Sequence, residues 1–124
     1  MSLRPRLFLV AACLAALVPA TTFADSTGSS GVVEELAVYE SGSDNYAMAN
    51  GILTVKESGG TKREYKWGGS LCAGRNVSAN SISLLFDAMR SQSSVNIIPS
   101  YKVGSGNTRC LTGFKLVTNR TAPS

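Results

Sequence analysis

The chain has 124 residues, 12 of them basic and eight acidic, and carries a formal charge of +4 at pH 7. It contains no histidine, which excludes a Ser-His-Asp triad, a Cys-His pair and a metal site built on imidazole. Three cysteines cannot supply a four-thiolate zinc site. Length and composition favour one small domain that uses no cofactor and lacks the commonest catalytic groups.

The N-terminal segment, residues 1–24, is typical of a cleavable export signal. Two arginines precede an apolar run over residues 7–18, and small residues lead up to Ala24. The run is shorter than the about 20 apolar residues that a membrane span requires. We therefore expect cleavage after Ala24 and an exported protein, periplasmic or extracellular, with no transmembrane segment. The alternative is a lipoprotein signal that ends at Cys13.

The remaining chain is expected to form a single domain over residues 32–118. Residues 25–31 are rich in serine and glycine and predict a flexible leader, and residues 119–124 a polar tail. Residues 32–40 are rich in β-forming side chains, which predicts the first strand. Residues 41–51 predict a loop rich in turns.

The clearest pattern predicts a hairpin over residues 52–67. Leu53 and Val55 alternate with polar residues in its first strand, and Tyr65 and Trp67 do so in the second, around a Ser-Gly-Gly turn. These four side chains are expected to face the core. Three charged side chains should face water from the other side of the sheet: Lys62, Glu64 and Lys66.

One helix is predicted, running to about Ser91, with Ser78 or Asn80 as its N-cap. Apolar residues recur there at helical spacing: Ile82, Leu85, Phe86 and Met89. Strands over residues 95–103 and 109–117 follow, with Pro99 indicating an edge or a bulge. The order β-β-β-α-β-β predicts an α+β fold in which one helix packs on a mainly antiparallel sheet.

Cys72 and Cys110 are predicted to form a disulfide, because export would place them in an oxidising compartment. The bridge would tie the segment before the helix to the last strand. By restricting the unfolded chain it would stabilise the fold by roughly 4 kcal/mol. Two free, buried thiols are the alternative.

Loss of Arg4 and Arg6 with the signal leaves ten basic and eight acidic residues, a net charge of +2. Six acids and one base precede Lys62, whereas nine bases and two acids lie from Lys62 onward. Either the two parts pack together and their fields partly cancel, or a basic face stays open to an acidic partner. The residues expected to make that contact are Lys62, Glu64, Lys66, Arg75 and Arg109.

These features predict an exported, non-catalytic domain that binds another protein with an acidic surface, such as an inhibitor, an immunity-type protein or an envelope accessory protein. One alternative is a module that binds carbohydrate or an envelope polymer on a platform of Trp67 and Tyr65. A weaker one is a small hydrolase with paired carboxylates. The alternation of lysines with the aromatic residues argues against nucleic acid as the ligand. The sequence indicates no calcium loop and no phosphate-binding glycine loop.

Overall fold

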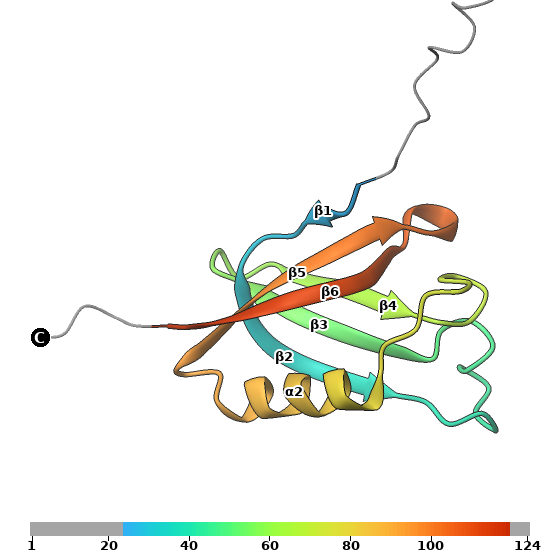
Figure 1. Cartoon of the computed structure of the whole chain (residues 1–124), viewed down its shortest axis with the longest axis horizontal. Coiled ribbons are helices and arrows are strands. Elements are labelled where there is room, and N and C mark those ends of the chain that lie inside the picture. The colour runs from blue at the N-terminus through green and yellow to red at the C-terminus, as the bar shows by residue number, and fades with distance from the viewer. Residues whose placement is uncertain (1–23, 120–124) are drawn as a thin grey trace, which may run out of the picture.

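The computed structural model describes residues 24–119 (Figure 1). The predicted export signal, except for Ala24, and the predicted tail beyond Asn119 lie outside the described residues. The described elements, in chain order, are β1 (Ser26–Thr27), β2 (Gly31–Val38), β3 (Gly51–Glu57), β4 (Lys62–Trp67), α2 (Ala79–Arg90), β5 (Val95–Val103), the short 3₁₀ helix η2 (Ser105–Asn107) and β6 (Arg109–Thr118).

Five of the strands close into a barrel. They follow the order β5-β2-β3-β4-β6, and β6 pairs again with β5, so that the sheet returns on itself. β4 and β6 pair in parallel, and the other neighbours are antiparallel. The predicted open sheet under a helix is therefore wrong. Alternation of apolar and polar residues fits the inside and outside of a barrel as well as it fits the two faces of a sheet.

The connections give the barrel a Greek-key character. The first three barrel strands, β2, β3 and β4, are sequential neighbours, and the chain then crosses through α2 to β5 before β6 inserts between β5 and β4 (Figure 1). A five-stranded Greek-key barrel of this kind has the architecture of the OB fold. Architecture alone assigns no ligand, so function has to be argued from particular side chains.

The predicted hairpin is confirmed by the register of β3 and β4. Leu53 lies opposite Tyr65 and Val55 opposite Arg63, while Gly51 lies opposite Trp67. The four predicted core side chains of the hairpin are buried and belong to the barrel core, together with Val33, Ile97 and Leu111. Alternation within these two strands was therefore sufficient to assign inside and outside.

The helix α2 begins and ends close to where the sequence predicts. The Ser78 hydroxyl accepts a hydrogen bond from the Ser81 N–H at 3.1 Å, which caps the N-terminus. Leu85 and Ala88 are buried, whereas Phe86, predicted to lie in the core, is 47% exposed. The helix lies alongside β2 at the side of the barrel instead of across a sheet (Figure 1), so only part of its apolar face is covered.

The N-terminal part of the described chain belongs to the sheet. Residues 25–31, for which we predicted a flexible leader, include β1, which pairs with Ser100 and Tyr101 of β5. Gly28 is buried and its N–H donates to the Pro99 carbonyl at 2.8 Å. The strand β5 has a register irregularity directly after Ser100, in keeping with the bulge that Pro99 predicts.

The predicted disulfide between Cys72 and Cys110 is confirmed, with Cα atoms 5.6 Å apart. It joins the loop after β4 to β6, on the outside of the barrel, because Cys110 pairs with the outward-facing Lys66. The bridge indicates a non-cytoplasmic, oxidising environment. Within residues 24–119, no helix is long and apolar enough to cross a membrane.

Candidate functional site

The outer surface of the β3–β4 hairpin carries three of the five predicted contact residues. Lys62, Glu64 and Lys66 alternate with the buried aromatic residues and project away from the core. Side chains of β3 lie opposite each of them. This surface, here called the hairpin face, comprises Ile52, Thr54, Lys56, Lys62, Glu64 and Lys66.

Acidic neighbours neutralise part of the charge on the hairpin face. Glu34, which lies at a register shift in β2, is 3.5 Å from the Lys62 Nζ atom. The Lys66 Nζ atom is 3.9 Å from Glu64. Exposed ion pairs of this kind contribute little to stability. The hairpin face is therefore mixed in charge, which fits the first of the two alternatives that the charge distribution left open, in which acidic and basic parts pack together and their fields partly cancel.

At one end of the hairpin face the positive charge is not balanced in this way. Two lysines, Lys56 and Lys62, lie directly opposite each other there across the antiparallel pair. Two like charges in that position destabilise a sheet. Lys62 has Glu34 as a counter-ion, whereas Lys56 is exposed and makes no ion pair with any residue from 24 to 119. A positive charge that folding does not use therefore remains at this end of the hairpin.

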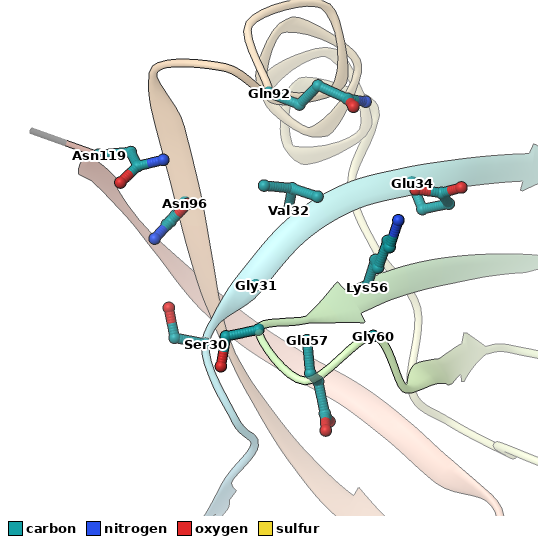
Figure 2. A pocket seen from close by; sticks show the side chains of 11 residues that line it. Ser30, Gly31, Val32, Glu34, Lys56, Glu57, Gly60, Gln92, Asn96 and Asn119 are labelled. Atoms are coloured by element: carbon teal, nitrogen blue, oxygen red, sulfur yellow. The ribbon is translucent and has the colours of Figure 1, made fainter. Parts of the chain in front are cut away.

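A polar pocket of about 520 Å³ opens beside Lys56 (Figure 2). Lys56 and Glu34 lie on one side of Val32 (Figure 2). The other side carries three amide side chains, which come from the turn after α2, from the start of β5 and from the residue after β6: Gln92, Asn96 and Asn119. Ser30 and Ser58 add hydroxyl groups to the lining. The pocket thus combines one ammonium group, carboxylates and several neutral hydrogen-bonding groups.

One of these amides also holds the pocket together. The Gln92 Nε2 group donates to the Val33 carbonyl at 3.2 Å and so ties the end of α2 to β2. The pocket exists because β5 pairs with β2 only at Gly31, after which the two strands separate. The single pairing at Gly31 is one of the contacts that close the barrel, so the pocket forms beside it only when the barrel closes.

Arg109 is turned toward the interior of the barrel and does not join the hairpin face. Its guanidinium carbon lies 4.4 Å from the centroid of the Tyr101 ring, and its Nη1 donates to the Tyr65 hydroxyl at 3.2 Å. Arg75 lies in the loop after Cys72 and lines a different cavity, of about 470 Å³, together with Lys102. These two predicted contact residues are thus placed apart from Lys62, Glu64 and Lys66.

The aromatic platform that the carbohydrate alternative requires is not present at the surface. Tyr65 is fully buried and Trp67 is 2% exposed, so neither ring offers a face to a sugar. Burial raises the pKa of the Tyr65 phenol, and the hydrogen bond from Arg109 acts in the opposite direction. Tyr65 is therefore a neutral part of the core at physiological pH.

The pocket carboxylates do not form a converging pair. Glu57 is 3.3 Å from the Arg63 Nε atom, and Figure 2 shows its side chain pointing away from that of Glu34. In the described part of the chain, no group of three or more possible ligands could hold a metal ion. The geometry thus lends no support to the carboxylate-based hydrolase.

The residues that sequence reasoning missed are Lys56 and the three pocket amides. Lys56 follows the alternation that buries Leu53 and Val55, so the same pattern could have placed it beside Lys62. The amides come from separate elements and meet only when the barrel closes, which leaves no local signal. Comparisons of this chain with protein-family models, with curated proteins and with solved structures give no match.

Proposed function

We propose that this protein is an exported, non-catalytic domain that binds another protein through an acidic surface of that partner. The Lys56–Lys62 end of the hairpin face and the adjoining pocket would form the contact. The observation that carries this proposal is the opposed lysine pair, in which Lys56 has no counter-ion among the described residues. Such an arrangement costs folding free energy, and a carboxylate from a partner would offset that cost.

The pocket next to the lysines suits the other groups of a docked protein loop. Amide side chains both donate and accept hydrogen bonds, so Gln92, Asn96 and Asn119 can pair with backbone N–H and C=O groups. Glu34 lowers the net positive charge of the site because it already pairs with Lys62. An acidic residue of the partner would therefore bind best where it reaches Lys56. The contact would therefore combine charge attraction with directional hydrogen bonds.

The support for a binding role is the rigidity of the surface. The hairpin face lies on two strands of a closed barrel that pair with each other along their length, and the disulfide fixes the loop that follows β4. A surface whose side chains are held in place loses little conformational entropy when a partner docks. An inhibitor, an immunity-type protein or an envelope accessory protein would each bind its partner through such a surface.

Export is part of the proposal and rests on the features of residues 1–24 and on the disulfide. Mass spectrometry of the protein from its native source should find a mature N-terminus at Asp25. An intact Met1 would contradict export by a cleaved signal. A lipid on Cys13 would show that the lipoprotein alternative is correct.

The binding surface can be tested with poly-L-glutamate as a probe. In an NMR titration of ¹⁵N-labelled protein at low salt, the largest amide shifts should occur at Lys56, Lys62 and their neighbours. Lys56→Glu should weaken the affinity by about tenfold or more, chiefly through a slower association rate that depends on salt. The control is Lys115→Glu, which makes the same charge change at an exposed position on β6. Equal losses from the two variants would refute the proposed site.

A further inference from the structure

A second concave surface lies between β2 and α2 and shares no residue with the hairpin face or with the pocket of Figure 2. It is a groove of about 540 Å³ whose lining is largely apolar. Phe86 of α2 and Val38 of β2 are each about half exposed there. Exposed apolar side chains gathered in a concave site are typical of a binding surface. The groove is lined by Leu36, Val38, Ile82, Ser83, Phe86, Asp87 and Met89.

One backbone edge of β2 beside the groove lacks a partner strand among residues 24–119, although the Gln92 side chain donates to its Val33 carbonyl. β3 pairs with β2 along its length, whereas β5 pairs with β2 only at Gly31. The Tyr39 N–H donates to the Asn50 carbonyl on the β3 side, so the backbone groups of the preceding residue, Val38, point to the opposite edge. Within residues 24–119, no strand pairs with that edge after Gly31, and α2 runs alongside it (Figure 1).

An extended peptide could add to this edge as a further strand. Its backbone would hydrogen-bond to β2, and alternate side chains would point to opposite sides. One set would enter the groove against Phe86 and Met89 of α2. The other set would lie beside Glu35, which pairs with Thr54 on the outer surface of the barrel. A peptide that fits this geometry would therefore carry an apolar residue at every second position.

The charges around β2 indicate which residue type suits the peptide positions between the apolar ones. Glu35 is exposed and, like Glu40 just beyond the strand, makes no ion pair with any described residue. Asp87 shares only an exposed contact of 3.9 Å with Arg90. A second copy of this chain, adding its own β2 in antiparallel fashion, would bring Glu34 and Glu35 of the two copies together. Like charges on adjacent strands disfavour that dimer and favour a basic partner.

We propose that the β2–α2 groove binds an extended segment of a partner protein in which apolar and basic residues alternate, and that the segment adds as a strand to the free edge of β2. The apolar residues fill the groove between the strand and the helix. The basic residues pair with Glu35 and its acidic neighbours. This site is independent of the acidic partner surface proposed for the hairpin face.

The test uses a fluorescein-labelled peptide, acetyl-Val-Lys-Val-Lys-Val-Lys-amide, in a fluorescence polarisation titration. Phe86→Ser should weaken its affinity by about tenfold or more, because the ring forms a wall of the groove. The matched control is Leu84→Ser, since Leu84 is 49% exposed on the same helix but lines a different cavity. Its affinity should stay within about twofold of the wild type. Glu35→Lys, an exposed change outside the groove, should also weaken binding.

Two altered peptides test the mode of binding. A peptide with N-methyl groups on alternate amides cannot form the strand ladder and should bind at least about tenfold more weakly. Hydrogen exchange at the Val38 amide should slow when the unmodified peptide binds. Equal affinity for the methylated peptide would refute strand addition. Equal affinity for a Val-Glu peptide of the same length would refute the role of the acidic residues.

Two further measurements separate this inference from its rivals. Sedimentation equilibrium should show a monomer, and a dimer that Phe86→Ser dissociates would mean that a second copy occupies the groove. Lys56→Glu should bind the Val-Lys peptide as tightly as the wild type. Unchanged poly-L-glutamate affinity in Lys56→Glu, with peptide binding that still depends on Phe86, would thus refute the proposed function alone. Unchanged peptide affinity in Phe86→Ser, with poly-L-glutamate binding lost in Lys56→Glu, would refute the groove alone.

Discussion

Gly51 lies directly opposite Trp67 in the β3–β4 ladder, and the indole ring occupies the space that a side chain at Gly51 would need. A Cβ atom at Gly51 would overlap three atoms of that ring, so the ring or the backbone would have to shift. Glycine at this position therefore allows the single tryptophan of the chain to lie inside the barrel. The hairpin face outside depends on this arrangement, because Trp67 sets the side on which its neighbour Lys66 projects.

Gly51→Ala should lower the free energy of unfolding by about 1–3 kcal/mol, since the added methyl group overpacks the core against Trp67. The control is Gly59→Ala in the β3–β4 turn, where an added Cβ would have nothing within 4 Å. That change should stay within about 0.5 kcal/mol of the wild type in urea denaturation. Similar losses for both variants would show that the close approach of Trp67 is not the cause.

Reversing the charge of Lys62 and Lys66 together to Glu should leave the melting temperature within a few degrees of the wild type. Both side chains lie outside the barrel, and each ion pair is partly exposed to solvent. Trp67→Ala should instead cost about 3–5 kcal/mol as a truncation in the core. Calorimetry on the two variants checks this contrast. A folded Trp67→Ala protein beside an unfolded charge-reversed one would mean that the two sides of the hairpin are assigned the wrong way round.

Replacing both Cys72 and Cys110 with Ser should lower stability by about 2–5 kcal/mol, the usual range for a small domain with one bridge. The loop closed by the bridge spans 38 positions of sequence, so its loss frees much of the unfolded chain. Alkylation of the unreduced wild-type protein in denaturant should label neither residue. Quantitative labelling of both would show that the thiols are free.

Alkaline pH should destabilise the protein in part through Tyr65. Its pKa is raised above the ordinary value of 10.0 because burial disfavours the phenolate, so the folded state holds its proton more tightly than the unfolded state. This contribution is fully present below about pH 10 and is lost as the pH rises through the folded pKa. Urea unfolding from pH 8 to 11 should show a smaller decline for Tyr65→Phe than for the wild type. An unchanged slope would contradict the assignment.

The hairpin, the helix and the disulfide were predictable because each depends on neighbouring residues or on an elementary pairing rule. Alternation places Tyr65 and Trp67 inside, and the Ser78 hydroxyl marks the start of the helix. Closure of the barrel was not predictable in the same way. It depends on the parallel pairing of Lys66 with Cys110 and on the single pairing of Gly31 with Ile97, and neither leaves a periodic trace.

In the candidate site, too, local sequence patterns predict some features, and others depend on the folded barrel. Lys62, Glu64 and Lys66 share a surface because period-two alternation is a local property. Arg109 also follows a strand pattern, yet its side chain turns to the rings of Tyr101 and Tyr65, which only the folded barrel brings within reach. The distribution of positive charge along the sequence therefore did not predict which basic side chains are available to a partner.

The most direct test of the proposed site compares two properties of one variant, Lys56→Glu. Opposite Lys62, a glutamate would replace two opposed like charges with an opposite pair. We expect the free energy of unfolding in urea to stay equal to that of the wild type or to rise by up to about 1 kcal/mol, while the affinity for poly-L-glutamate falls by about tenfold or more. Unchanged affinity, or a loss of affinity that merely follows a loss of stability, would contradict the account.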